Sequence, residues 1–398
     1  MRTQAWQKFR SSGRRTAGAA LAVGVMAVSA LTAPAAFAAP DPGPAARPDA
    51  AHPAPARPDT LQQGLDALVR DDGMPAALAS VRDRDGRTRT YTAGVGDVAT
   101  GAAVPRDGQV RIGSNTKAFT AAVVLQLVGE GRVGLDTPVD AYLPGLVRGE
   151  RIDGSRITVR HLLGQTSGLP NYTEYDLQPK PYTPRDLVDI ALAHPGHFAP
   201  GEKWEYSNTN YVLAGMIVER VTHRSVAEEI TRRVITPLGL RHTYFPAPGD
   251  PTIREPHPHG YDRASATAPL VDITEMDPSW ASSAGQMIST NSDLNRFYTA
   301  LLTGGVLRPA QLAQMKQTVS AEFFGKGARY GLGLASFPLS CGGVYWGHGG
   351  SFPGYETRGG VRVTGGAVRA ANIAVTIQPT DKAVLDRMAT LVDASLCR

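Results

Sequence analysis

Apolar side chains recur with a helical period near both ends of the chain. In the segment "DTLQQGLDALVRDDGMP" (residues 59–75) they fall on one face of an amphipathic helix, which a Gly-Met-Pro sequence ends. The segment "KAVLDRMATLVDASLC" (residues 382–397) has the same period. We therefore expect one helix ahead of the first strands and another at the C-terminal end.

Extended runs lie just inside these two helices. Residues 76–97 contain two such runs about an Asp85-Gly86 turn, and "GGVRV" and "NIAVTIQ" flank Gly365-Gly366. Both patterns are typical of β-hairpins. The middle of the chain holds helix-like runs instead, such as "NYVLAGMIVERVTH". The prediction is an α/β fold, in which an antiparallel sheet built from both chain ends is flanked by helices and a mostly helical domain is inserted at roughly 135–300.

Residues 1–38 have the parts of a secretory signal. Five basic residues precede an apolar run, and small side chains at Ala36 to Ala38 offer a cleavage site. We expect cleavage near Ala38 and a secreted, extracellular protein, with Sec and twin-arginine export both open. A retained membrane anchor fits less well, because no stop-transfer pattern follows.

Residues 39–59 are rich in Pro, Ala and charge, a composition typical of a disordered spacer. This leaves residues 60–398 for the folded domain. The formal net charge of +5 is matched by the five basic residues of the signal, which has no acidic ones, so the mature chain is near neutral (5 − 5 = 0). The charge therefore gives no support for nucleic-acid binding.

The two cysteines, Cys341 and Cys397, both belong to the part expected to be exported. In an oxidising compartment they are expected to form a disulfide, the alternative being two free thiols.

The candidate chemistry begins with "RIGSNTKAFTAAVVLQL", where Ser114 precedes Lys117 by three residues at the start of an apolar helix. That spacing places both side chains on one face. A desolvated lysine with a lowered pKa could accept the proton of the serine hydroxyl. The alternative is a serine N-cap beside a solvated lysine. Lysine is scarce, however, and Lys117 alone of seven has a serine three residues before it.

A second candidate, "GEKWEYSNTNYVLAGM", places Tyr206 and Asn208 just before a helix-like run. A tyrosine near a lysine can pass a proton to a leaving group, and an amide can hold both the lysine and a substrate. The alternative is a turn with an asparagine N-cap.

The third element, "VYWGHGGSFPGYE", runs as an extended edge strand through His348, Gly349 and Gly350 to Ser351. Glycines there permit close backbone approach, so that an extended substrate could lie alongside. The backbone N–H groups of Ser114 and Ser351 could then form an oxyanion hole.

In this order, Ser-x-x-Lys, Tyr-x-Asn and His-x-Gly resemble the motifs of the penicillin-recognising serine hydrolases. The chain is most similar to secreted D-alanyl-D-alanine carboxypeptidases of the class C β-lactamase-like group. The likeness spans about Thr60 to Cys397 and includes "LVGEGRVGLDTPVDAYLPGL", "ITVRHLLGQTSGLP", "SWASSAGQMIST", "YGLGL" and the paired cysteines. It implies an α/β sheet domain and a helical domain with the site between them.

The resemblance also implies roles for individual residues. Ser114 is the acylated nucleophile, Lys117 its proton partner and Tyr206 a general acid/base. Six residues contribute to substrate binding: Asn208 as a positioning amide, Trp280 lining the cleft, and His348 with Gly349 and Gly350 on the sheet edge, followed by Ser351. It implies no metal and no cofactor, a small peptide, ester or β-lactam as substrate, cell-wall peptide as a further candidate, and a monomer.

Two departures concern the substrate. The carboxypeptidases carry threonine and arginine where this chain has Gly349 and Ala335, and those residues hold the terminal carboxylate of the peptide; Ser351 alone remains of that set. We therefore expect acylation of Ser114 with a preference for neutral leaving groups. Esterase, D-amino acid amidase or peptidase, and β-lactamase activity stay open. A noncatalytic cell-wall-binding protein fits less well, because the acylating residues are all retained.

Overall fold

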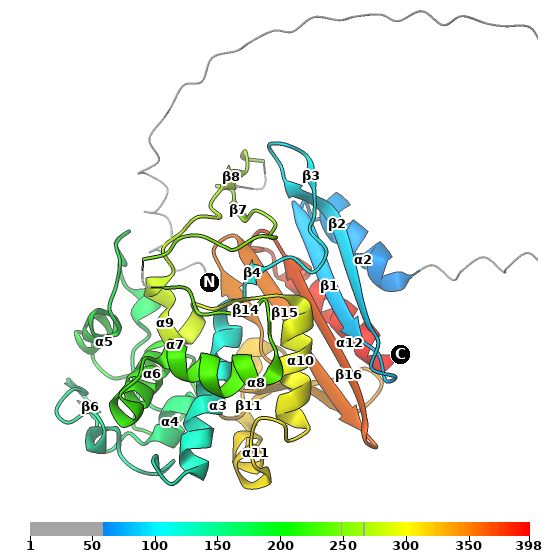
Figure 1. The fold of residues 1–398 in the computed structure, drawn as a ribbon. Coiled ribbons are helices and arrows are strands. Elements are labelled where there is room, and N and C mark those ends of the chain that lie inside the picture. Colours follow the sequence, from blue (N-terminus) through cyan, green and yellow to red (C-terminus); the bar gives the residue numbers. More distant parts are fainter. Residues whose placement is uncertain (1–58, 248, 266) are drawn as a thin grey trace, which may run out of the picture. The chain divides into compact units, whose positions relative to one another are not determined.

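Two β-hairpins from opposite ends of the chain form the centre of an antiparallel sheet in the computed structural model, which describes residues 59–247, 249–265 and 267–398. Strands β1 (Ala76–Arg82) and β2 (Thr88–Asp97) form the first hairpin, and β15 (Tyr355–Thr364) and β16 (Ala367–Val375) the second. Strand β1 pairs with β16, which places Ala77 opposite Val375 (Figure 1). The predicted sheet from both chain ends is confirmed.

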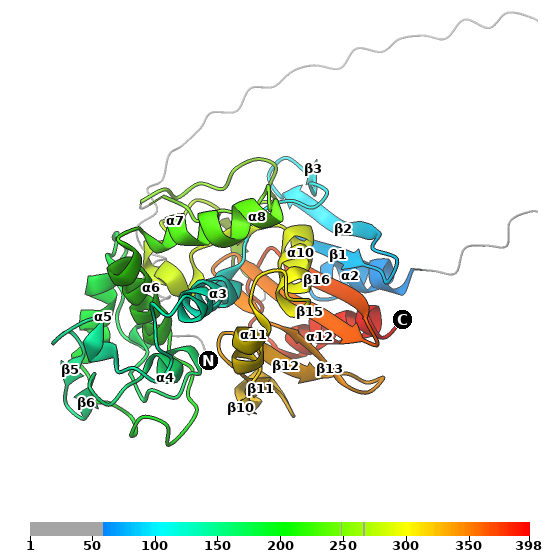
Figure 2. The ribbon, with the colours of Figure 1, turned by 60° about the horizontal axis from the view of Figure 1, so that its bottom comes forward.

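Shorter strands extend this sheet on both sides. Strand β3 (Ala102–Ala103) adds to β2, while β13 (Val344–Gly347), β12 (Ala335–Pro338), β11 (Arg329–Tyr330) and β10 (Val319–Ser320) continue it beyond β15 (Figure 2). Strand β14 (Gly350–Phe352) pairs with β15 alone. The predicted edge strand through His348 is therefore two strands: β13 lies inside the sheet, and β14 leaves its second side open. Two-stranded ladders form elsewhere: β4 (Val110–Arg111) with β9 (Ile288–Ser289), β5 (Arg148–Gly149) with β6 (Ile152–Asp153), and β7 (Tyr261–Asp262) with β8 (Val271–Asp272).

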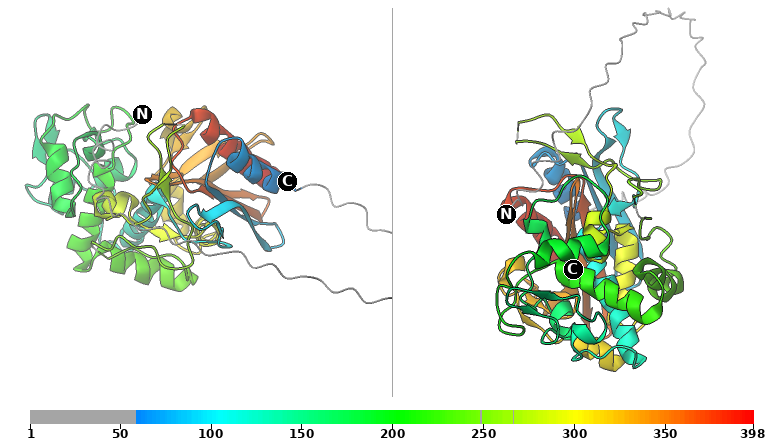
Figure 3. Two further views of the ribbon diagram at one scale, coloured as in Figure 1. Left: turned by 90° about the horizontal axis from the view of Figure 1, so that it is seen from above. Right: turned by 90° about the vertical axis from the view of Figure 1, so that its left-hand side faces the viewer.

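The two predicted terminal helices cover one face of the sheet. Helix α2 (Thr60–Arg70) begins where the Asp59 carboxylate accepts a hydrogen bond from the backbone N–H of Leu61, and α12 (Lys382–Cys397) packs beside it (Figure 3). Their apolar faces share one core cluster with inward side chains of β1 and β16. Both helix predictions are confirmed.

The opposite face carries α10 (Asn291–Leu302), which packs on β1 and β16. The other helices in the described ranges are α3 (Thr116–Gly129), α4 (Val159–Leu163), α5 (Pro184–Leu192), α6 (Thr209–Thr222), α7 (Val226–Ile230), α8 (Thr236–Leu238), α9 (Ser282–Gly285) and α11 (Pro309–Met315). Helix α3 is apolar on every side because α6, α7, α9 and α11 surround it. Helix α3 packs within the helical region although it precedes residue 135, where the inserted helical domain is predicted to begin. The limits of that domain therefore stay a prediction.

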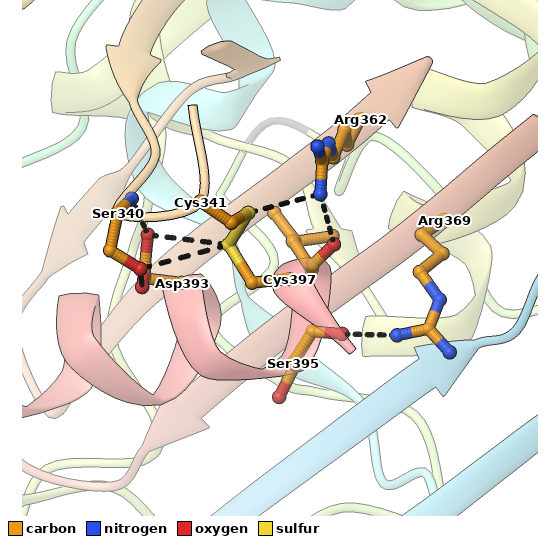
Figure 4. Close-up of a disulfide and its surroundings, with 8 residues drawn as sticks. Ser340, Cys341, Arg362, Arg369, Asp393, Ser395 and Cys397 are labelled. Atoms are coloured by element: carbon orange, nitrogen blue, oxygen red, sulfur yellow. Dashed lines mark hydrogen bonds between the residues drawn. A yellow bond between two sulfur atoms is a disulfide. The ribbon is translucent and has the colours of Figure 1, made fainter. Parts of the chain in front are cut away.

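A disulfide joins Cys341, in the turn after β12, to Cys397 at the end of α12, with 5.8 Å between the two Cα atoms (Figure 4). The Arg362 guanidinium donates hydrogen bonds to the Cys341 sulfur and to the Leu396 carbonyl, and Arg369 donates one to the Ser395 carbonyl. Two arginines on neighbouring strands thus bind the carbonyl end of α12, where a helix attracts cations. The predicted pairing is present, and the free-thiol alternative is wrong.

The predicted signal (1–38) and residues 39–58 of the predicted spacer lie outside the described residues. Among the residues that are described, no helix has the length and apolar character needed to cross a membrane.

Candidate active site

Ser114 lies in a 3₁₀ turn (Gly113–Asn115) between β4 and α3. The next side chain fixes this turn: the Asn115 amide donates to the Ile112 carbonyl and to Thr357 Oγ1 of β15, at 3.1 and 2.8 Å, and accepts from Tyr298. The Ser114 side chain makes no capping hydrogen bond. The N-cap alternative is therefore wrong, and the half-buried hydroxyl is available to a neighbour.

That neighbour is Lys117, one helical turn further on. Its Nζ lies 3.0 Å from Ser114 Oγ, and it donates to Asn208 Oδ1 at 2.7 Å and to the Ala284 carbonyl at 2.8 Å. The lysine is fully buried, and this desolvation lowers its pKa well below the ordinary value. The alternative of a solvated lysine is wrong.

Tyr206 and Asn208 reach the same point from the segment before α6. The Tyr206 ring centroid lies 4.8 Å from Lys117 Nζ. Burial and the adjacent Tyr330 raise the Tyr206 pKa well above its ordinary value, against a hydrogen bond to Ser114 and the charge of Arg358. Asn208 makes no capping bond either; its amide nitrogen donates to Asn171 and Thr173 while its oxygen accepts from Lys117.

His348 is buried between β13 and β14 with its ring centroid 6.3 Å from that of Tyr206. Its Nε2 lies 3.3 Å from the Tyr330 hydroxyl, and its Nδ1 faces the Gly349 carbonyl. Burial, with the charge of Lys117, lowers the His348 pKa to about 3. The imidazole is therefore a neutral wall of the site.

Two glycines let the nucleophile's turn lie directly against β14. A Cβ on Gly113 would stand 2.6 Å from the Ser351 carbonyl oxygen and 2.9 Å from the Ser351 nitrogen, and a Cβ on Gly350 would collide with the Ile112 carbonyl. Both clashes involve backbone, so side chains at these positions would separate the two segments. This close packing brings the backbone of Ser351 beside that of Ser114.

Gly349 and Ala335, the two positions where the carboxypeptidases carry threonine and arginine, both pack against other parts of the chain. A Cβ on Gly349 would collide with the guanidinium of Arg358, a residue of β15 that lies 2.8 Å from the carboxylate of the buried Glu356. Ala335 is fully buried in a cluster with Ala321 and Tyr330.

Trp280 lies in a 3₁₀ turn (Ser279–Ala281). Its ring centroid is 5.1 Å from that of Phe352, and its carbonyl accepts from the Tyr172 hydroxyl at 2.7 Å. Ser282 follows with a φ of +43°, a strained value for a side-chain-bearing residue, just before the Ala284 carbonyl that binds Lys117.

The structure thus brings Lys117, Tyr206 and Asn208 together at Ser114. His348 lies beside Tyr206, Ser351 beside the Ser114 turn, and Trp280 beside Phe352 of β14. Sequence reasoning missed the residues that hold them there: Asn115, Asn171, Thr173, Ala284, Arg358 and Glu356. Asn115 lies inside the serine motif, so its position was a usable signal. Glu356 and Ala284 also lie inside quoted segments, but neither residue type there indicates the contact that it makes. Nowhere in the described ranges do three His, Cys, Asp or Glu side chains gather so as to hold a metal ion.

The chain belongs to the beta-lactamase family, whose model matches residues 59–390. The resemblance to penicillin-recognising serine hydrolases is confirmed, and the protein is a serine hydrolase of this family. It is 33% identical to protein flp of Staphylococcus aureus over 189 residues, which are 47% of this chain and 37% of flp. The chain thus spans little more than a third of the length of that relative.

Two solved structures match along most of the chain. A D-stereospecific amidohydrolase from Streptomyces sp. has a TM-score of 0.73 and 41% identity, covering 82% of this chain and 97% of its own. The D-amino acid amidase of Ochrobactrum anthropi SV3, in complex with L-phenylalanine amide, has a TM-score of 0.74 and 28% identity, covering 85% of this chain and 98% of its own. These matches confirm the predicted α/β fold class.

Proposed function

We propose that the protein is a secreted, D-stereospecific amide and ester hydrolase that works through an acyl-enzyme on Ser114. The observation that carries the proposal is the position of Lys117 Nζ, 3.0 Å from Ser114 Oγ and bound to two carbonyl oxygens. A neutral lysine has two N–H bonds and one lone pair. The two carbonyls use both N–H bonds, so the lone pair faces the serine hydroxyl and can accept its proton.

The reaction then follows from the site. Ser114 Oγ bonds to the substrate carbonyl carbon as its proton passes to Lys117, and the carbonyl oxygen becomes an oxyanion that the N–H groups of Ser114 and Ser351 stabilise. The carbon–nitrogen or carbon–oxygen bond of the leaving group breaks as Tyr206 and Lys117 return the proton to it. Water hydrolyses the remaining ester and restores the Ser114 hydroxyl.

The surroundings of Ala335 and Gly349 support the preference for neutral leaving groups. Ala335 is buried and Gly349 is apposed to Arg358, whose charge Glu356 balances, so neither position offers a group dedicated to a terminal carboxylate. The D-amino acid preference is supported by the names of the two solved neighbours. Secretion is supported by the Cys341–Cys397 disulfide, since such bonds persist in oxidising compartments. We further expect a monomer.

The test is to incubate the mature protein and its Ser114→Ala variant with D- and L-phenylalanine amide and with benzylpenicillin. We expect the native protein to release ammonia from the D-amide alone, and the variant to be inactive. A penicillin adduct on native protein only would identify the nucleophile, whereas penicillin turnover exceeding amide turnover would favour a β-lactamase.

Two results would contradict the proposal. A steep preference for a D-alanyl peptide with a free terminal carboxylate over its amide would restore the carboxypeptidase hypothesis. The absence of both turnover and an adduct would favour the noncatalytic cell-wall-binding protein.

A further inference from the structure

An aromatic cluster borders the candidate site beside Tyr206. We call it the aromatic wall; its members are Trp204, Phe323, Phe324 and Tyr330. The Phe323 ring stacks on the Tyr206 ring at 5.7 Å and 14°, while Phe324 meets Tyr206 edge-on at 5.7 Å. Phe324 also contacts the His348 ring at 5.6 Å. The aromatic wall thus joins a small core cluster around Tyr330 to the rings of Tyr206 and His348 at the candidate site.

Phe323 differs from its neighbours in exposure. Its relative exposure is 73%, the highest among the exposed large apolar residues in the described part of the chain. It lies in the 3₁₀ turn Glu322–Phe324 between β10 and β11. A phenyl ring that contacts Trp204, Tyr206 and Phe324 and is still open to water on most of its surface indicates a surface used for binding.

The position of the ring decides which part of a substrate it can meet. In the proposed mechanism Tyr206 delivers the proton to the leaving group, so a ring stacked on Tyr206 borders the leaving group and not the acyl part. Trp280 lies against Phe352 of β14 instead. The acyl part and the leaving group thus have separate aromatic neighbours.

A small apolar cluster and a paired arginine lie beside the aromatic wall. Ala335 is buried against Tyr330 and Phe324, and Arg358, whose charge acts on Tyr206 and His348, is paired with Glu356 at 2.8 Å. An apolar ring on a leaving group would stack here on other rings, whereas a carboxylate would have to give up water for aromatic edges and faces.

We propose that Phe323 is a specificity-determining residue that binds aromatic or large apolar leaving groups, the amine part of an amide or the alcohol part of an ester, by stacking on them. This rests on the proposed function. Of two substrates with the same acyl part, the one with an aromatic leaving group is thereby preferred over the one with a small leaving group.

The test compares D-phenylalanine p-nitroanilide with D-phenylalanine amide, which share the acyl part and differ in the leaving group. A stacked aromatic pair corresponds to about a threefold to tenfold effect on binding. We expect Phe323→Ala to lower the ratio of kcat/KM for the anilide to kcat/KM for the amide by that factor, while Phe323→Tyr keeps the native ratio. Val363→Ala, which shortens another exposed apolar side chain at the far end of β15, is the matched control.

Equal losses on both substrates, or no loss on either, would overturn the inference. A second measurement needs no turnover: calorimetry of the Ser114→Ala protein with each compound. We expect the anilide to bind threefold to tenfold more tightly than the amide, and the added Phe323→Ala change to abolish that difference. If native protein cleaves neither compound, the proposed function fails; if the Ser114→Ala protein also binds them equally, the inference about Phe323 fails as well.

Discussion

Replacing Gly113 by alanine tests whether the turn that carries Ser114 must touch β14. The added Cβ would stand 2.6 Å from the Ser351 carbonyl oxygen, whereas ordinary contacts begin at 3.4 Å, so the two backbones must separate by about 0.8 Å (3.4 − 2.6). Gly113 also has a φ of +48°, which costs a residue with a side chain about 1 kcal/mol or more. The change therefore has a geometric and a conformational component.

The two components predict different readouts. A misplacement near one ångström in the machinery lowers kcat/KM by about a hundredfold, equivalent to about 2.7 kcal/mol of activation free energy. The conformational component lowers the free energy of unfolding and leaves the chemistry alone. We expect Gly113→Ala to show both effects when hydrolysis of D-phenylalanine amide and urea unfolding are measured on the same protein.

Gly101 provides the matched control, because its φ is +73° and a Cβ there meets nothing within 4 Å. We expect Gly101→Ala to lose stability and keep its native kcat/KM. If Gly113→Ala matches this control, losing stability while keeping kcat/KM within about threefold of native, then contact between the turn and β14 does not position the catalytic groups.

Two further predictions concern Lys117 and the disulfide. Burial holds the Lys117 pKa in the folded protein well below its ordinary value of 10.5. At any pH between the folded and the ordinary pKa, the unfolded chain therefore binds one more proton, so the free energy of unfolding should rise with pH across this range. Lys117→Met should remove this slope in urea titrations. The disulfide closes a loop across a sequence separation of 56, so Cys397→Ser should lower the free energy of unfolding by about 4 kcal/mol, and reduction of the native protein should give a similar loss; a change below about 1 kcal/mol would contradict the chain-entropy account.

The sheet and its terminal helices were predictable because their patterns are local. Alternation and turn glycines define the hairpins at Asp85-Gly86 and Gly365-Gly366, and a 3.6-residue period defines α2 and α12. Helix α3 is apolar all round and has no such face, so its burial within the helical region followed only from the tertiary structure.

The candidate site likewise contains some residues that local spacing predicts and others that only the tertiary structure brings in. Ser114 and Lys117 are one helical turn apart, and that spacing alone brings them together. The Ala284 carbonyl that completes the lysine's hydrogen bonds lies 167 residues further on and carries no side-chain signal, because any residue type has that oxygen. The position of the Arg358 guanidinium beside Gly349 could not be predicted either, because a glycine in the sequence does not indicate which other side chain occupies the space next to it.

The pairing of β1 with β16 has a consequence for the order in which the molecule can assemble during its synthesis. Ala77 finds its partner only when Val375 has been made, 298 residues later (375 − 77), and long-range pairings of this kind form slowly. Strand β15, to which the Ser114 turn is tied through Asn115, comes in the same late stretch. A nascent chain therefore carries its serine and lysine without the sheet that holds them in place until β15 and β16 have been made, and hydrolytic competence should arise only after that stage.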